Sequence, residues 1–116
     1  DGKLYAVGGY NDNDNDGGGS LSSVERYDPA VGAWEEAAPM AAARMDHAVA
    51  ALDGQLYAVG GRSNGASRSS VERYDPALDA WEAVAPMASA RLEHAVAVLD
   101  GELYAVGGSD NDGPLS

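Results

Sequence analysis

The chain repeats itself along its length. Residues 22–61 align without a gap on residues 69–108, and 31 of the 40 aligned positions are identical. A nine-residue segment, Asp-Gly-x-Leu-Tyr-Ala-Val-Gly-Gly, occurs three times, beginning at Asp1, Asp53 and Asp100. Such self-similarity indicates tandem units that stack, because one small unit cannot bury its own apolar face. The sequence therefore predicts a series of packed repeats.

Each unit is expected to contain four short β-strands. The chain has 15 glycines among 116 residues, and its frequent Asp-Gly, Gly-Gly and Asp-Pro pairs favour short strands over helices. An Asp-Gly pair of the kind that closes two-residue hairpins follows the first strand, and prolines end the third and fourth. The predicted fold class is all-β, built from four-stranded antiparallel meanders. The expected strands of one unit are residues 47–52, 56–59, 70–74 and 80–84.

Charge and composition exclude several classes of partner. Nineteen acidic and seven basic residues give a net charge of −12, so neither nucleic acid nor an anionic membrane is an expected partner. No apolar run approaches the ~20 residues of a spanning helix. The absence of cysteine excludes disulfides and Cys-ligated metals but leaves the cellular compartment open. The amino-acid composition is rich in alanine and aspartate and poor in lysine, and in this respect it resembles that of proteins of salt-loving microbes.

The landmarks of each unit follow the order of a known repeat. Gly-Gly ends a Tyr-containing strand, and Val-Glu-Arg-Tyr-Asp-Pro, Trp, Ala-Pro-Met and Arg-x-x-His-Ala follow in step in both copies. This pattern resembles the kelch repeat, whose units form the blades of a β-propeller with strands A to D from the inside outwards. The resemblance divides the chain into strands B, C and D of one blade (1–38), a complete blade (39–85), and strands A and B of a further blade with a loop (86–116).

About two and a quarter blades cannot close a propeller, so an incomplete ring is expected. Two arrangements are open: the remaining blades belong to a longer chain, or several copies assemble. Assembly leaves one B strand surplus, because residues 4–9 and 103–108 compete for the same place. The expected partners therefore include a second copy of the chain or the remaining blades.

Most repeated residues are expected to form the framework of the blades. Glycines at the end of strand B allow another segment to approach closely, and the aromatic rings are expected to fill the space between stacked blades. The two arginines are expected to pair with Glu25 and Glu72 or with loop carbonyls. The framework residues are Gly8, Gly9, Gly60, Gly61, Gly107, Gly108, Tyr27, Tyr74, Trp34, Trp81, Arg44 and Arg91.

Recognition is expected on one rim of the stack. Connections in a meander alternate between its ends, so the D–A connection (39–46) and the B–C connection (10–21) share a rim, which also carries the length differences between repeats. The kelch resemblance implies a non-catalytic module that binds protein, or a glycan, at this rim. Acidic residues there argue against an acidic peptide. The alternative function is a self-assembling scaffold without a ligand. The candidate rim residues are Asp46, Glu93, Tyr10, Arg62, Asn64 and Arg68.

One acidic segment carries a candidate metal site. Asp12, Asp14 and Asp16, followed by Gly17, match the opening of a calcium-binding loop. The twelfth position is Ser23 instead of glutamate, so a solvated acidic loop is the competing interpretation. Calcium is the only cofactor that the sequence suggests.

Catalysis has little support in the sequence. His47 and His94 are equivalent by repeat and lie at the start of inner strands, which indicates structural histidines. No order of Ser, His and Asp suggests a triad. The chain is therefore not expected to be an enzyme.

Overall fold

The computed structural model describes residues 2–11, 19–63 and 65–115. Within these ranges the chain forms strands and turns, and no helix there could span a membrane. The expected all-β fold class is confirmed. The strands are β1 (Leu4–Asn11), β2 (Gly19–Asp28), β3 (Ala33–Ala37), β4 (Ala48–Leu52), β5 (Gln55–Val59), β6 (Arg62–Ser63), β7 (Ala66–Ser67), β8 (Val71–Asp75), β9 (Ala80–Val84), β10 (Ala95–Leu99), β11 (Glu102–Val106), β12 (Ser109–Asp110) and β13 (Gly113–Pro114).

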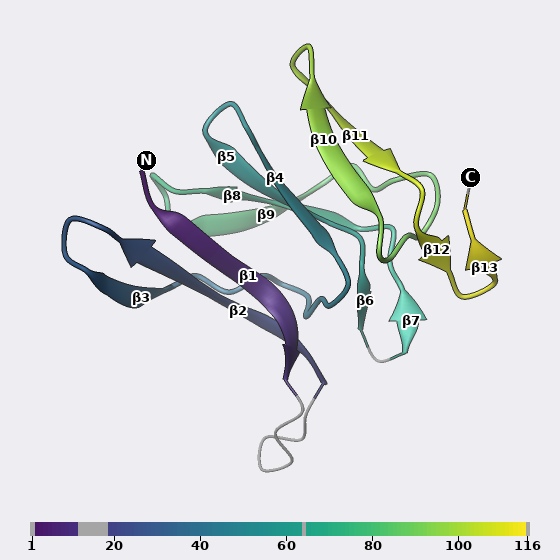
Figure 1. Ribbon diagram of the computed structural model, residues 1–116, viewed down its shortest axis with the longest axis horizontal. Coiled ribbons are helices and arrows are strands. Elements are labelled where there is room, and N and C mark those ends of the chain that lie inside the picture. The colour runs from purple at the N-terminus through teal and green to yellow at the C-terminus, as the bar shows by residue number, and fades with distance from the viewer. Residues whose placement is uncertain (1, 12–18, 64, 116) are drawn as a thin grey trace.

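Three antiparallel sheets follow one another along the chain and fan out as blades (Figure 1). Blade 1 has the order β1-β2-β3, blade 2 has β4-β5-β8-β9, and blade 3 has β10-β11. Blade 2 is thus a complete four-stranded meander, and the described residues give blade 1 no strand A and blade 3 no strand C or D. The two incomplete blades lie at opposite ends of the stack.

The strands of blade 2 lie close to their predicted positions. β9 covers the predicted residues, β4 and β5 differ by one residue at one end, and β8 is shifted by one residue at both ends. Their limits follow from local chemistry. Asp53 and Gly54 both have positive φ in the tight turn between β4 and β5, a conformation that glycine adopts freely and aspartate tolerates.

The B–C connections contain strands that the sequence did not predict. β6–β7 and β12–β13 form small hairpins in these connections, so residues 109–115 are not the plain loop expected. In blade 1, β1 and β2 continue through a bulge after Val7. Single bridges from the D–A connections, Met45 to Arg62 and Leu92 to Ser109, support the hairpins. Each of these hairpin strands is only two residues long and depends on contacts with residues distant in sequence. A segment this short carries no sequence pattern from which the strand could be predicted.

The glycine pairs mark where blades approach. A Cβ at Gly60 would lie 2.6 Å from the carbonyl oxygen of Arg91, and a Cβ at Gly61 would lie 2.6 Å from that of Met45. Equivalent glycines at the ends of the stack differ, because Gly9 and Gly107 have nothing within 4 Å of such an atom among the described residues. The same sequence motif is therefore constrained by packing only where its neighbour is present.

The core lies between blades 1 and 2. Val24, Met40 and Ala58 form a buried cluster. Tyr5, Val7, Ala37 and Trp81 pack against it. The core is small, which agrees with a composition that has no phenylalanine and two tryptophans.

Tyr74 and Trp34 show how position in the stack decides burial. Tyr74 is completely buried, and its ring centroid lies 5.6 Å from that of Tyr5 and 5.1 Å from that of Trp81. Trp34, which is equivalent to Trp81, is 49% exposed. The expectation that Trp34 packs between blades is wrong for a single chain, because its face of blade 1 has no blade beside it in the described residues.

Candidate functional site

The candidate rim is built where the D–A connection runs beside the B–C connections. Met45 and Arg62 exchange two backbone hydrogen bonds of 3.0 and 2.8 Å, and the Arg44 amide donates to the Leu21 carbonyl at 2.9 Å. One connection thus contacts the B–C segments of both blade 1 and blade 2. Figure 1 shows β6 beside the lower ends of β1 and β2. We call this end of the stack the ligand rim.

A hollow of about 320 Å³ lies on the ligand rim between blades 1 and 2. Both blades and the D–A connection contribute to its wall, so three segments distant in sequence meet there. Tyr10 is 60% exposed, and its aromatic ring is available to a ligand. The lining residues are Tyr10, Gly19, Ser20, Ala43, Met45, Arg62, Ser63 and Gly65.

The charged groups beside the hollow form a matched pair. Arg62 Nε lies 3.1 Å from Asp46 Oδ2, and both side chains are partly exposed. Asp46 has φ of 54°, and its repeat equivalent Glu93 has φ of 53°, so both acidic residues adopt the left-handed conformation that side chains rarely favour. The Glu93 amide also donates to the Asp46 carbonyl at 2.8 Å. Asp46 is therefore held at the edge of the hollow by both its backbone and its side chain.

The other predicted rim residues have different places. Arg68 turns toward its own loop, where Nε donates to Ser63 Oγ at 3.0 Å and supports the β6–β7 hairpin. Glu93 belongs to the next D–A connection, and Asn64 lies outside the described residues. Tyr10 and Arg62 thus line one hollow, Asp46 pairs with Arg62, and Arg68 contacts the hollow only through Ser63.

Sequence reasoning missed the wall that the D–A connection provides. Met45 lines the hollow, and its equivalent in the second repeat is Leu92. The difference between Met45 and Leu92 was visible in the sequence, because Met45 and Asp46 are two adjacent positions among the nine that differ between repeats. Two adjacent substitutions beside this rim were the available signal, and a similar pair, at Val31 and Gly32, lies in the opposite C–D turn.

Arg44 and Glu72 form a buried ionic centre inside blade 2. Arg44 Nη2 lies 2.9 Å from Glu72 Oε2, and the two side chains are 1% and 5% exposed. Arg44 Nη1 also donates to the carbonyls of Gly60 and Ser70, each at 2.9 Å. The Glu72 carboxylate accepts the Ala41 amide at 2.6 Å. Arg44 therefore binds both a carboxylate and backbone carbonyls, the two kinds of partner that the sequence analysis left as alternatives.

Repeat-equivalent Arg91 has a simpler environment. Its Nη1 donates to the Gly107 carbonyl at 2.7 Å, and no described carboxylate pairs with it. The strand that would carry the equivalent of Glu72 is not part of blade 3 in the described residues.

His47 joins the start of strand A of blade 2 to strand B of blade 1, whereas both ring nitrogens of His94 are buried without a described hydrogen-bond partner. His47 Nε2 donates to the Val7 carbonyl oxygen at 2.7 Å, a role that requires the proton on this nitrogen. Burial lowers the pKa of His47, and the hydrogen bond to Val7 opposes this shift without cancelling it. Burial also lowers the pKa of His94. Neither histidine has a described nucleophile as a hydrogen-bonding partner.

Acid should weaken the fold through these histidines. A histidine titrates near pH 6.5 in the unfolded chain, and the folded pKa values lie lower, so the unfolded state takes up protons first as the pH falls. Stability contributed by neutral His47 and His94 is therefore complete above about pH 6.5 and decreases below it. Urea melts at pH 7.5 and 5.5 should show a smaller midpoint decrease for His47→Gln than for the wild type. Equal decreases would contradict this role for His47.

The predicted calcium ligands Asp12, Asp14 and Asp16 lie outside the described residues. Elsewhere in the chain, the part that the structure describes contains no cluster of three or more His, Asp or Glu side chains that could hold a metal ion. The calcium interpretation of this segment stays a prediction.

Comparison with known proteins agrees with the repeats and sheets. The kelch motif matches residues 1–41, 43–88 and 90–116. Mouse Kelch-like protein 35 is 48% identical over 60 residues, which are 52% of this chain and 10% of that protein. Human Kelch-like protein 33 is 47% identical over 62 residues, 53% of this chain and 10% of that protein. The mouse influenza virus NS1A-binding protein homolog is 47% identical over 60 residues, 52% of this chain and 9% of that protein.

A solved structure supports the propeller fold. The structure of YjhT superposes with a TM-score of 0.80 over 94% of this chain and 42% of that one, at 16% sequence identity. The matched part of the chain spans about a tenth of the curated relatives. With kelch motifs along almost all of its length and blades that superpose on a solved structure, this chain belongs to the kelch-repeat family.

Proposed function

We propose that this chain is a non-catalytic recognition module that binds a short segment of a protein partner in the hollow of the ligand rim. The observation that carries the proposal is the hollow itself, where an exposed Tyr10 ring and the Met45 side chain lie beside the Arg62–Asp46 pair. An apolar wall with a few oriented polar groups is typical of recognition sites. One relative is named for binding a protein, NS1A, which fits this class of function.

The opposite rim, formed by the A–B and C–D turns, is a less suitable place for recognition. The A–B turn is Asp-Gly in both complete copies, and the C–D turn starts with Asp-Pro-Ala in both. In each C–D turn an aspartate side chain accepts a backbone amide two residues later at 2.9 Å, so these turns are stabilised locally. The length differences between repeats and the mixed hollow lie on the ligand rim instead. Loops that vary on a fixed scaffold commonly carry recognition.

The charge of the site defines the segment that it should accept. Asp46 and Glu93 carry negative charge at this rim, and the whole chain has a net charge of −12. An acidic peptide would be repelled, whereas a neutral or basic segment would be attracted. We infer a segment with one apolar side chain for the Tyr10 and Met45 surface, followed by a basic residue near Asp46.

The test selects peptides on the folded chain and then measures where they bind. Twelve-residue peptides displayed on phage are selected against the full chain, and calorimetry gives their dissociation constants for variants. Tyr10→Ala should weaken binding at least about tenfold, the effect of losing ~1.4 kcal/mol. Leu78→Ala is the matched control, because Leu78 is an exposed apolar residue on the opposite rim and should leave affinity unchanged.

Each outcome decides between surfaces. Binding that Leu78→Ala weakens and Tyr10→Ala does not would place recognition on the opposite rim and overturn the proposal. Peptides that fail to bind while a glycan array binds would replace a protein ligand with a glycan.

A further inference from the structure

The β6–β7 hairpin lies between the hollow and blade 3. Arg62, Ser63 and Gly65 of this hairpin line the hollow on the side of blade 1. Figure 1 shows β7 between β6 and β12, so the β12–β13 hairpin of blade 3 lies on the other side. The wall of the hollow therefore has a second neighbour, which belongs to the next blade.

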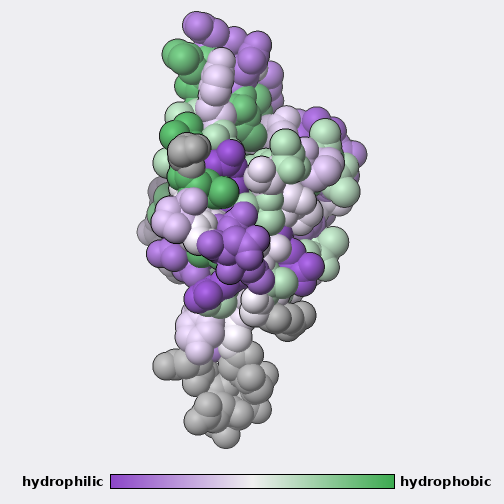
Figure 2. Space-filling model, turned by 90° about the vertical axis from the view of Figure 1, so that its right-hand side faces the viewer, coloured by the Kyte–Doolittle hydropathy of each residue, from purple (hydrophilic) through white to green (hydrophobic). Residues whose placement is uncertain are grey.

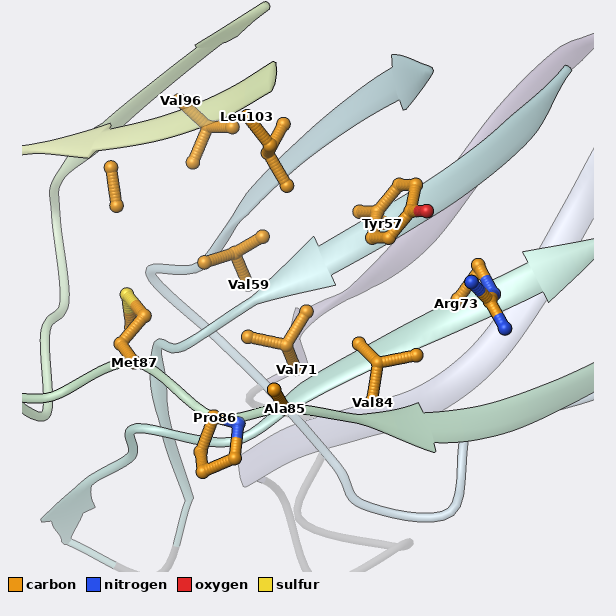
Figure 3. A pocket seen from close by; sticks show the side chains of 11 residues that line it. Tyr57, Val59, Val71, Arg73, Val84, Ala85, Pro86, Met87, Val96 and Leu103 are labelled. Atoms are coloured by element: carbon orange, nitrogen blue, oxygen red, sulfur yellow. The ribbon is translucent and has the colours of Figure 1, made fainter. Parts of the chain in front are cut away.

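Blades 2 and 3 meet in two different ways. Their sheets face each other across a groove of about 360 Å³, and Figure 3 shows Val96 and Leu103 on one wall and Val59 and Val71 on the other. At the ligand rim the two blades are joined by hydrogen bonds instead. Directional contacts of this kind can fix the position of a loop.

Backbone hydrogen bonds hold the base of the β6–β7 hairpin. The Gly61 amide donates to the Arg91 carbonyl at 2.7 Å, and the Arg91 amide donates to the Arg68 carbonyl at 3.0 Å. Gly61 and Arg68 directly precede and follow the hairpin. Because these bonds use main-chain groups, which nearly every residue carries, they do not depend on particular side chains.

One side chain of blade 3 holds the outer strand of the hairpin. Asn111, in the turn between β12 and β13, accepts a hydrogen bond from the Ser67 amide through Oδ1 at 2.9 Å. Ser67 lies opposite Arg62 in the β6–β7 pair, and the Arg62 backbone is bonded to Met45. Met45, Arg62, Ser67 and Asn111 thus form a row that runs from the hollow to blade 3.

The bond to Ser67 is not a general feature of the repeats. Counted from the Gly-Gly pair, the position of Ser67 in blade 3 is occupied by Pro114, which has no amide hydrogen. The β12–β13 hairpin therefore cannot accept the same kind of support. The contact is specific to the hairpin that borders the hollow.

Asn111 lies in polar, exposed surroundings. Figure 2 looks onto the blade 3 side and shows hydrophilic residues over its middle, at the height of the β12–β13 hairpin. Asn111 and its neighbour Asp112 are both exposed, so replacing either removes no packing from the core. A hairpin with two-residue strands has little stability of its own. Its position therefore depends on contacts such as the one from Asn111.

We propose that Asn111 is a positioning residue for the hollow of the ligand rim. It holds Ser67 on β7 and so keeps Arg62, on the paired strand, beside Asp46 at the wall of the hollow. Asn111 is not among the described residues that line the hollow, so it acts through the hairpin. The inference rests on the proposed function, because it concerns the same binding site.

Binding rates distinguish positioning from direct contact. Association and dissociation rates of the full chain are measured on an immobilised twelve-residue peptide selected as above, in 0.5 M NaCl to screen charge. Asn111→Ala should lower the association rate about three- to tenfold, the effect of one hydrogen bond, because only chains with the hairpin in place bind. The dissociation rate should stay nearly constant, whereas loss of a direct contact would mainly raise it.

Two variants control this measurement. Asn111→Asp keeps an acceptor oxygen for the Ser67 amide and should restore the association rate. Asp112→Ala truncates the adjacent exposed side chain, which has no described hydrogen-bonding partner, and should bind like the wild type. Neither Asn111 nor Asp112 has positive φ, so alanine fits both positions without backbone strain.

Amide exchange measured by NMR tests the same role without a peptide. Asn111→Ala should speed exchange at the Ser67 amide, which loses its acceptor, and at the Arg62 amide on the paired strand. The amides of β4 and β5 lie in the sheet of blade 2 and should exchange at unchanged rates. Asn111→Asp should return the Ser67 and Arg62 amides to wild-type exchange.

The outcomes separate this inference from the proposed function. If Tyr10→Ala weakens peptide binding and Asn111→Ala does not, recognition on the rim stands and the positioning role of Asn111 is overturned. A raised dissociation rate with an unchanged association rate would also overturn it, since Asn111 would then contact the peptide. Equal exchange of the Ser67 and Arg62 amides in Asn111→Ala and the wild type overturns it whatever the peptide does. If Tyr10→Ala leaves affinity unchanged, the proposed function fails, and faster exchange in Asn111→Ala would still support the hold of Asn111 on the hairpin.

Discussion

Arg44→Ala is expected to lower the free energy of unfolding by about 3–5 kcal/mol. The substitution leaves the Glu72 carboxylate buried without its cation and removes the donors for the Gly60 and Ser70 carbonyls. Domains of this size have total stabilities of ~5–15 kcal/mol, so the variant should be close to unfolding. Urea melts at low micromolar protein concentration, followed by circular dichroism, measure the effect.

Arg91→Ala is the matched control for this experiment. Arg91 occupies the equivalent position but donates only to the Gly107 carbonyl among the described residues, so its loss should be about 1 kcal/mol. If Arg44→Ala and Arg91→Ala lowered the free energy of unfolding equally, the ion pair with Glu72 would not be what makes Arg44 important for stability.

Tyr74→Ala is expected to cost about 3–5 kcal/mol, the usual range for truncating a buried aromatic residue. Its ring is completely buried between Tyr5 and Trp81, and its hydroxyl is hydrogen-bonded to Asp79. Burial and the neighbouring Asp79 carboxylate raise the pKa of the Tyr74 phenol, so the hydroxyl stays a donor at neutral pH. Thermal and urea melts of the same samples give the change in stability.

Tyr27→Ala should cost only about 1 kcal/mol in the monomer, because Tyr27 lies on the open face of blade 1. Tyr74→Phe separates the ring from the hydroxyl and should lose about 1 kcal/mol with the Asp79 bond. A Tyr27→Ala loss as large as that of Tyr74→Ala, measured where the chain is monomeric, would contradict the assignment of the open face.

The repeats made most of the strands predictable. Glycine and proline punctuation located β9 without error and β4, β5 and β8 to within one residue. The kelch landmarks then supplied the order of strands in a blade. Turn residues and alternating burial are local properties of a short stretch of sequence. They are therefore sufficient to predict the position of a five-residue strand.

Environment was harder to predict than secondary structure. Trp34 and Trp81 occupy equivalent positions, and the sequence alone suggested equal burial, yet among the described residues only Trp81 has a blade beside it. The hydrogen bond from Trp81 Nε1 to the Ala38 carbonyl shows what the neighbouring segment contributes. Repeat equivalence therefore predicts which residue contacts a neighbour but does not show whether that neighbour is present.

The ligand rim shows the same difference between predicting the position of a residue and predicting its contacts. Tyr10, Arg62 and Asp46 were predicted as rim residues from the connections that carry them; Tyr10 and Arg62 line one hollow, and Asp46 pairs with Arg62 beside it. Arg68 was placed on the rim by the same reasoning, and its side chain donates to Ser63, which lines the hollow, without lining the hollow itself. The direction of a long side chain in a loop depends on tertiary contacts that spacing along the sequence does not encode.

Hydrogen–deuterium exchange of the full chain, with and without a selected peptide, tests most directly that recognition occurs on the ligand rim. We expect the peptide to slow exchange at the backbone amides of residues 43–46 and 62–63, which border the hollow. The opposite turns, residues 29–32 and 76–79, should exchange at unchanged rates. Slower exchange at those turns, with no change at the hollow, would contradict the proposed function.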